Sequence, residues 1–314
     1  MSAPAGSTGR DRRRRATSRG PARAGVAAAV VICLAIVAWL LHSGTLHGSH
    51  GAHRSAKAPG GGLSPPAGYK LVWADDFNGL RGSRPDPAKW RFETGGNGWG
   101  NNELQYYTTT PSNASLDGAG HLAITARRQV YTGSDGVTRD YTSALIETSG
   151  LFKTTYGWIQ ARIKLPAGAG LWPAFWAIGS DFDQVGWPAS GEIDLMENIG
   201  SDPFKVYGVL HGPAPGKPNG YNLVAATRSA TSLAAGFHVF GIDWSPGKIV
   251  FTLDGAPYAT RTPASLPSGG KWVFDKPFYF ILNLAVGGNF PGPPDATTEF
   301  PATMLVDWVR VYSH

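Results

Sequence analysis

The sequence predicts an all-β fold made of two packed antiparallel sheets, a sandwich or jelly roll, over residues 67–314. Short runs of alternating apolar and polar residues recur along this range, which is the pattern of half-buried strands. Turn signals separate the runs, and the chain contains 42 Gly and 24 Pro. No long amphipathic helix pattern interrupts them. Many strands with frequent turns are typical of a sandwich or jelly roll.

Individual segments show the strand pattern clearly. In residues 158–165 (WIQARIKL), Gln, Arg and Lys alternate with Ile, Ala, Ile and Leu, so one face is predicted to be buried. Residues 278–286 (FYFILNLAV) are nearly all apolar, as expected of a central strand covered on both faces. Pro246 and Gly247 form a turn that predicts a hairpin between two flanking strands. The other predicted strands are residues 121–127, 238–244, 249–255 and 305–312.

A basic tail and an apolar run precede the predicted sandwich. Residues 1–23 contain seven Arg and one Asp, and residues 24–41 form a run of eighteen residues without a charge. This run is long enough for a short membrane helix and longer than the usual apolar core of a signal peptide. The positive-inside rule keeps the basic tail in the cytoplasm and sends the following chain across the membrane. We expect an uncleaved membrane anchor, with a cleaved signal peptide as the alternative, and an extracytoplasmic location.

Residues 42–66 are predicted to be a linker, because they are rich in Gly, Ser, Pro and Ala and lack apolar periodicity. Four His residues in this range could bind a metal, but nothing fixes a coordination geometry, so a solvated spacer is favoured. The only Cys, Cys33, lies inside the apolar run. The exported part therefore cannot form disulfides, and its stability must come from its core.

The charge balance argues against a nucleic-acid partner. The formal net charge is +6, and the tail of residues 1–23 accounts for all of it, so the rest of the chain is neutral overall. A domain that binds nucleic acid usually carries a clustered basic surface. We therefore expect no nucleic-acid partner for the predicted sandwich.

Three acids, Glu192, Asp194 and Glu197, lie within six residues of the segment GEIDLMENIG. On a regular strand, Glu192 and Asp194 share one face and Glu197 points to the other. One extra residue that bulges at Leu195–Met196 would return Glu197 to the shared face. Burying three carboxylates is costly, so the cluster indicates a function. Catalysis by a carboxyl pair about 5–5.5 Å apart, as in a retaining glycosidase, is the favoured interpretation, with a cation site and a chance cluster as alternatives.

Aromatic and amide side chains accompany the acids. Residues 170–179 (GLWPAFWAIG) place Trp172 and Trp176 four positions apart, on one strand face. Trp187 lies shortly before the acids, and residues 98–107 (GWGNNELQYY) mix aromatic, amide and acidic residues. Packing in the core is the simpler interpretation of any single Trp. Rings and amides gathered around an acid triplet favour a sugar-binding site.

Residues 187–200 (WPASGEIDLMENIG) resemble the active-site signature of glycoside hydrolase family 16, in the E-x-D-x-x-E form of its laminarinase-like branch. Similar matches cover nearly all of residues 67–314 in the family's order: NNELQYYT, GLWPAFWAIG, VLHG, GGNFPG and VDWVRVY. The resemblance implies a curved jelly-roll sandwich with a concave substrate cleft. It also implies retaining hydrolysis of internal β-1,3 linkages in a β-glucan, by a monomer that needs no catalytic cofactor.

The resemblance implies a role for each acid. Glu192 is the expected nucleophile, and it must be ionised to attack the anomeric carbon. Glu197 is the expected general acid/base, which protonates the leaving sugar and then accepts a proton from water. Asp194 is the expected assisting carboxylate. Two like charges nearby favour the protonated form of Glu197 near neutral pH.

Further residues follow from the same resemblance. The expected sugar contacts are Asn101, Glu103, Trp172, Trp176, Trp187, His211 and Asn283. His211 taken alone would more simply be a satisfied core histidine. Some relatives bind one structural Ca²⁺ on the convex side, which implies a possible site formed by the carboxylate of Asp307 and backbone oxygens at Asp76 and Gly120. Asp307 could equally cap a surface strand.

Other functions stay open. A wall-associated transglycosylase would hand the glycosyl intermediate to another sugar and would use the same Glu192 and Glu197. A non-catalytic β-glucan-binding protein typically lacks the acids, whereas all three are present here. An enzyme for another polysaccharide, such as a galactan, is a further alternative, although the NNELQYYT and GGNFPG motifs favour β-1,3-glucan.

Overall fold

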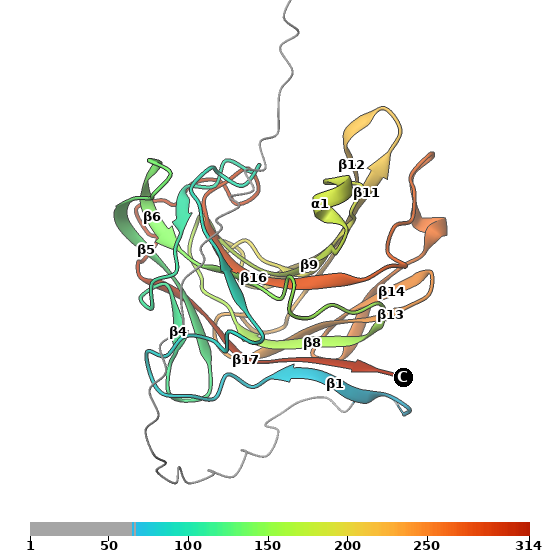
Figure 1. The fold of residues 1–314 in the computed structure, drawn as a ribbon, viewed down its shortest axis with the longest axis horizontal. Helices are drawn as coiled ribbons and strands as arrows, with labels where there is room; N and C mark the ends of the chain where they lie inside the picture. The colour runs from blue at the N-terminus through green and yellow to red at the C-terminus, as the bar shows by residue number, and fades with distance from the viewer. Residues whose placement is uncertain (1–64, 66) are drawn as a thin grey trace, which may run out of the picture. The chain divides into compact units, whose positions relative to one another are not determined.

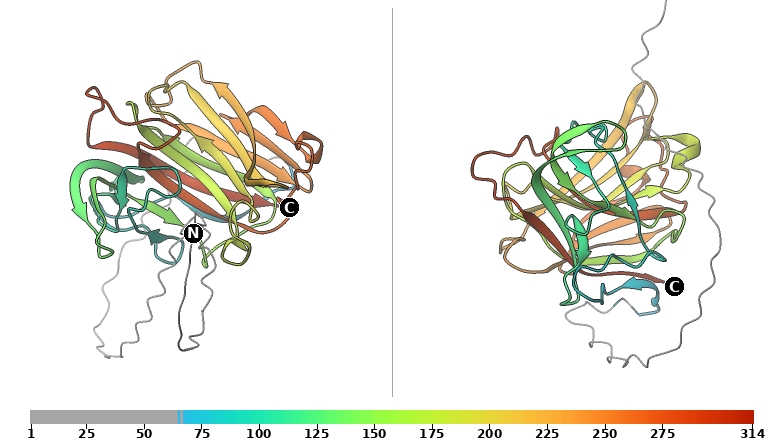
Figure 2. Two further views of the ribbon diagram at one scale, coloured as in Figure 1. Left: turned by 90° about the horizontal axis from the view of Figure 1, so that it is seen from above. Right: turned by 60° about the vertical axis from the view of Figure 1, so that its left-hand side comes forward.

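The computed structural model describes residue 65 and residues 67–314, which fold into two stacked β-sheets (Figures 1 and 2). The predicted basic tail, the predicted membrane helix and all of the predicted linker except residue 65 lie outside the described residues. Within the described part of the chain, no helix is long and apolar enough to cross a membrane.

The larger of the two sheets among the described residues has ten strands, and its main path runs β15-β14-β13-β8-β17-β5-β6-β3. Its strands are β1 (Lys70–Asp75), β3 (Gln105–Tyr107), β4 (Ala114–Leu116), β5 (Leu122–Thr132), β6 (Thr138–Ser143), β8 (Gly157–Lys164), β13 (His238–Ser245), β14 (Lys248–Leu253), β15 (Ala256–Arg261) and β17 (Ala302–Ser313). β1 pairs with β17, and β4 pairs with β5. The pairings are antiparallel, as predicted, except for that of β3 with β6 at the edge, which is parallel.

The second sheet has seven strands in the order β12-β11-β10-β9-β16-β7-β2, all antiparallel. Its strands are β2 (Arg91–Glu93), β7 (Leu145–Glu147), β9 (Leu171–Gly179), β10 (Glu192–Glu197), β11 (Lys205–Ala214), β12 (Lys217–Arg228) and β16 (Phe278–Val286). In Figure 1 this sheet curves, and its concave face points away from the larger sheet. The described helices are α1 (Phe182–Val185) and a 3₁₀ turn (Pro263–Ser265).

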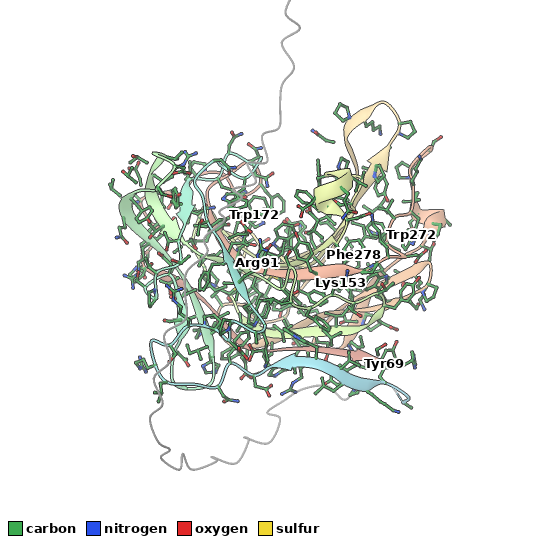
Figure 3. All side chains as sticks on the ribbon, viewed as in Figure 1. Tyr69, Arg91, Lys153, Trp172, Trp272 and Phe278 are labelled. Atoms are coloured by element: carbon green, nitrogen blue, oxygen red, sulfur yellow. The ribbon has the colours of Figure 1, made fainter. Side chains whose placement is uncertain are left out.

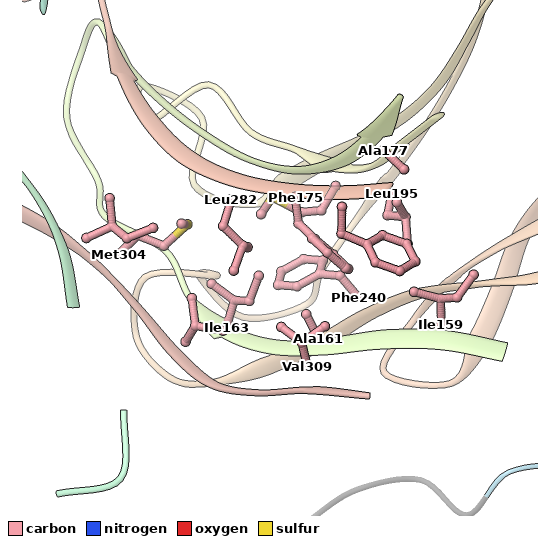
Figure 4. Close-up of a cluster of buried hydrophobic side chains, with 14 of the residues drawn as sticks. Ile159, Ala161, Ile163, Phe175, Ala177, Leu195, Phe240, Leu282, Met304 and Val309 are labelled. Carbon is pink, nitrogen blue, oxygen red and sulfur yellow. The ribbon is translucent and has the colours of Figure 1, made fainter. Parts of the chain in front are cut away.

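The hydrophobic core lies between the sheets. Figure 4 shows Phe175, Leu195 and Leu282 of the seven-stranded sheet facing Ile163 and Phe240 of the larger sheet. All five side chains are buried, and such close packing of two inner faces is the main stabilising contribution in a sandwich without disulfides.

The predicted alternation in β8 is confirmed, because Ile159, Ala161 and Ile163 are fully buried. Gln160, predicted on the polar face, is also buried. We predicted that both faces of β16 are covered. The core face is covered, because its side chains belong to the main hydrophobic cluster. On the concave side, Ile281 packs in a smaller cluster with Tyr107, Leu145 and Ile178.

Candidate active site

The predicted bulge in β10 is confirmed. The pairing of β10 with β9 shifts between Asp194 and Met196, and its pairing with β11 shifts between Asp194 and Glu197. Leu195 and Met196 are adjacent in sequence, and both belong to the buried core cluster. Because two consecutive side chains point into the core, Glu197 returns to the concave face that Glu192 and Asp194 occupy.

Aromatic N–H groups and one histidine contact the acids. Trp172 Nε1 donates a hydrogen bond of 2.9 Å to Glu197 Oε1, and the Trp187 side chain donates to the carboxyl group of Glu192. His211 lies opposite Glu192 on β11, and its Nε2 is 3.7 Å from Glu192 Oε1 and 3.1 Å from Asp194 Oδ2. The structure therefore brings three predicted sugar contacts into direct contact with the predicted catalytic acids.

The surroundings of the two glutamates favour their protonated forms. Burial and the negative charge of Asp194 raise the pKa of both Glu192 and Glu197, while His211 opposes the shift. The pKa of Glu192 rises to about 8, and that of Glu197 lies well above its usual value. A general acid needs a carboxyl that holds its proton, and the Trp187 and His211 contacts favour the ionised form that a nucleophile needs at Glu192.

The surroundings of His211 favour its charged form. Its burial disfavours the charged form, but contact with Asp194 and the charges of Glu192 and Glu197 outweigh burial and raise its pKa to about 9. Within the described residues, Glu192, Asp194 and His211 are the one group of three with potential ligand atoms within 4.8 Å of one another. A metal binds neutral imidazole, so a cation at these atoms would have to displace the proton that the neighbouring acids favour on His211.

The other predicted sugar contacts form a polar network beside the acids. Trp176, which pairs with Asp194 across the sheet, donates from Nε1 to Asn283 Oδ1 at 2.8 Å. Asn283 Nδ2 donates to the Tyr107 hydroxyl at 2.9 Å, and this hydroxyl lies 3.2 Å from Glu103 Oε2. Glu103 is buried and also accepts hydrogen bonds from Gln105 at 2.6 Å and from the Asn101 side chain. The Glu103 carboxyl group therefore has protein side chains as its hydrogen-bond partners.

Several residues beside the acids had no role predicted from the sequence. Phe290 contacts the rings of both Trp172 and Tyr207, at centroid distances of 5.4 and 5.2 Å, and Tyr207 pairs with Glu197 across the sheet. Figure 3 shows Trp172 on the concave side of the sheet. Two of these residues had a signal in the sequence. Phe290 lies in the GGNFPG motif, and Tyr107 is four positions from Glu103, which places both on one face of a strand. Tyr207 carries no such signal, because its place depends on the bulged register.

The residues of the predicted calcium site lie outside this cluster. The carboxylate of Asp76 pairs with Arg310 at 2.8 Å, and the carboxylate of Asp307 pairs with Arg162. Gly120 lies in the turn before β5 with a positive φ of 92°. Each arginine pairs with one oxygen of its carboxylate, and these contacts do not test the predicted backbone ligands at Asp76 and Gly120. A structural calcium stays a prediction without support from them.

Comparisons with known proteins agree with this geometry. The model of "Glycosyl hydrolases family 16" matches residues 101–310. The chain is 39% identical to a beta-glucanase of Rhodothermus marinus, over 83% of this chain and 88% of that protein. It is similar in structure to an endo-beta-1,3-glucanase of Pyrococcus furiosus, with 45% identity, a TM-score of 0.72 and coverage of 78% of this chain and 94% of that one.

A second solved structure gives the same result. The laminarinase catalytic domain of Thermotoga maritima is 41% identical, with a TM-score of 0.72 and coverage of 78% of this chain and 98% of that one. The bulged acid strand, the two-sheet sandwich and a family match over most of the chain agree. The chain therefore belongs to glycosyl hydrolase family 16.

Proposed function

We propose that this protein is a retaining endo-β-1,3-glucanase, with Glu192 as nucleophile and Glu197 as general acid/base. The single observation that carries the proposal is the β10 bulge, which brings both glutamates to the concave face. The similarity to glucanases of three organisms supports a β-glucan as the substrate.

In the first step, the ionised carboxylate of Glu192 attacks the anomeric carbon while Glu197 gives its proton to the departing glycosidic oxygen. In the second step, Glu197 takes a proton from water, and the water oxygen replaces Glu192 at the anomeric carbon. Trp172 orients Glu197 through its N–H, and Trp187 and His211 stabilise the ionised form of Glu192. Asp194 raises the pKa of Glu197 and so favours the protonated form that the general acid needs.

The test compares the purified full-length protein with its Glu192→Gln variant on laminarin, mixed-linkage glucan, xyloglucan and agarose. We expect reducing sugar from laminarin with the wild type and none with the variant, whose circular dichroism spectrum should be unchanged. Release from agarose alone would reject the β-1,3-glucan substrate. Equal activity of the variant would reject the assignment of Glu192.

Transglycosylation uses the same two glutamates, so it is separated by its products. Hydrolysis of a laminari-oligosaccharide gives only shorter chains, whereas transfer also gives chains longer than the substrate. We propose hydrolysis as the main reaction, and chromatography of the products over time measures the ratio.

We also propose that the enzyme is a monomer that works outside the cytoplasm, close to a membrane. The charge-free run of residues 24–41 behind a basic tail supports this location. Fractionation of cells that express the tagged chain tests the location, and light scattering of the purified protein tests the monomer.

A further inference from the structure

A chain of hydrogen bonds leads from the concave face to a buried carboxylate. It begins at Trp176 Nε1, passes through the side-chain amide of Asn283 and the hydroxyl of Tyr107, and ends at Glu103 Oε2. Trp176 is half-buried, whereas Tyr107 and Glu103 are 1% and 6% exposed. The network thus connects a ring on the open face to groups that solvent barely reaches.

The indole end of this chain fixes the direction of the bonds, because an indole N–H can only donate. Asn283 therefore presents its oxygen to Trp176 and its N–H₂ group to the Tyr107 hydroxyl. The Tyr107 hydroxyl accepts this bond and has its own proton left to donate to Glu103 Oε2. Burial raises the pKa of Glu103 to about 7, and the hydrogen bonds from Gln105 and Tyr107 favour its ionised, accepting form. The reverse amide orientation would place an N–H₂ group against the indole N–H, which is unfavourable.

The structure also shows how Glu103 and Tyr107 are held. Gln105 donates to Glu103 and accepts a 2.7 Å bond from the backbone N–H of Val286, at the end of β16. The ring of Tyr107 packs against Trp99, at a centroid distance of 5.3 Å. Because ring packing fixes the position of Tyr107, removal of the hydroxyl alone changes the hydrogen bonds and leaves the packing in place.

We propose that Tyr107 is a positioning residue for substrate binding: its hydroxyl, held by Glu103, fixes the amide of Asn283 and through it the indole of Trp176 beside the catalytic acids. The inference rests on the proposed glucanase function and on sugar contact by Trp176. It assigns Glu103 to the support of the sugar-binding face, in place of the direct sugar contact expected from the sequence. Tyr107 does not touch the reacting atoms, so it affects substrate affinity far more than the chemical step.

The primary test is Tyr107→Phe in the full-length protein, with Tyr258→Phe as the control. Tyr258 is also a largely buried tyrosine, but its hydroxyl has no hydrogen-bond partner among the described residues, and it lies on β15 of the other sheet. We expect Tyr107→Phe to raise the KM for laminarin about tenfold, the effect of one lost well-aligned hydrogen bond, and to change kcat less than about threefold. Tyr258→Phe should leave both constants unchanged.

A double-mutant cycle distinguishes positioning from a general loss of stability. Trp176→Phe removes the indole N–H at which the chain begins. If Tyr107 acts through Trp176, the double variant should have the KM of Trp176→Phe alone, within about twofold. Multiplicative effects of the two substitutions, or an unchanged KM in Tyr107→Phe, would overturn the proposal.

Glu103 provides an independent pair of variants in case Tyr107→Phe does not fold. Glu103→Gln keeps a carbonyl oxygen that accepts from Tyr107, so KM should stay within about twofold of the wild type. Glu103→Leu removes the acceptor, frees the amide of Asn283 to turn, and should raise KM about tenfold. Equal KM values in the two variants would overturn the proposal.

Failure of the glucanase proposal can be distinguished from failure of the Tyr107 proposal. If the wild type releases no sugar from laminarin, the glucanase proposal fails. The Kd of laminarihexaose, measured by calorimetry, then still tests Tyr107. A weaker Kd in Tyr107→Phe than in Tyr258→Phe supports the positioning role, and equal values contradict it.

Discussion

The bulges of β10 and β17 each lie beside an acid, and only the bulge of β10 is proposed to be catalytic. In β17, the pairing with β8 shifts between Val306 and Trp308, and Asp307 occupies the extra position. Arg162 neutralises its carboxylate in an ion pair. In β10, Leu195 and Met196 form the bulge, and the nearest opposite charge to the acids is on His211.

The two bulges differ in the cation beside the acid, and this difference distinguishes a structural acid from a reactive one. An arginine is always charged, so the Asp307 carboxylate has a permanent cation as its partner. A histidine titrates near physiological pH, and burial raises the proton affinity of the carboxyl groups around it. Among the described residues, no Lys or Arg forms an ion pair with Glu192, Asp194 or Glu197, so no permanent cation fixes the charge of Glu192 or Glu197.

The largest expected effect is on kcat, and it should differ between substitutions in the two bulges. Glu192→Gln removes the nucleophile, and we expect kcat on laminarin to fall by about 10⁴-fold or more because no glycosyl intermediate can form. Asp307→Asn, the matched substitution in the other bulge, should leave kcat within about twofold. Initial rates of reducing-sugar release measure both. A comparable loss in Asp307→Asn would contradict the distinction drawn here.

The next largest effect is expected from loss of the Asp194 charge, which favours the protonated form of Glu197. Asp194→Asn removes a negative charge that raises the pKa of Glu197, so Glu197 should lose its proton at lower pH than in the wild type. The basic limb of the kcat profile should therefore move to lower pH, and kcat at pH 7 should fall about 10–100-fold. Rates between pH 4 and 10 test this. A basic limb that stays in place would show that Asp194 does not set the proton affinity of Glu197.

His211→Gln should act on the opposite limb. The cation of His211 lowers the pKa of Glu192, so its removal raises that pKa, and ionised Glu192 appears only at higher pH. We expect the acidic limb to move to higher pH, with kcat at pH 6 about tenfold lower, the effect of a shift of about one unit. The same pH series measures it. Movement of the limb to lower pH would reverse the charge argument.

The smallest effect is on stability. Asp307→Asn leaves Arg162 without its partner at a site where the Asp307 side chain is 15% exposed. We expect the free energy of unfolding to fall by about 1–3 kcal/mol, since one partner of a largely buried ion pair is lost. Urea unfolding followed by tryptophan fluorescence measures the change. An Arg162→Met/Asp307→Leu double variant with wild-type stability would show that the ion pair itself contributes little.

Local sequence patterns predicted several of the longer strands, but not β11 or β12. The alternation in β8 and the apolar run of β16 specify strands because each buries a continuous face. The three-residue strands β2, β3, β4 and β7 were not predicted, since so few residues show no periodicity. The parallel pairing of β3 with β6 depends on topology and leaves no local signal.

Within the site, the spacing of the acids predicted the bulge, because a period of two cannot otherwise gather Glu192, Asp194 and Glu197 on one face. The support network could not be predicted in the same way. Tyr107 and Asn283 are 176 positions apart and meet only through the tertiary fold. The burial of Glu103 likewise depends on the packing of the segment around it against the end of β16.

The most direct test of the central claim is chemical rescue of the two glutamates by azide, with an aryl β-glycoside of laminaribiose that needs no acid to leave. In Glu192→Ala, azide should replace the nucleophile and give the α-glycosyl azide in one inverting step. In Glu197→Ala, the Glu192 intermediate should still form, and azide should open it to the β-glycosyl azide. Proton NMR reads the anomeric configuration. Opposite anomers in this order are the predicted result, and the reverse order or the same anomer from both variants would contradict the assignment.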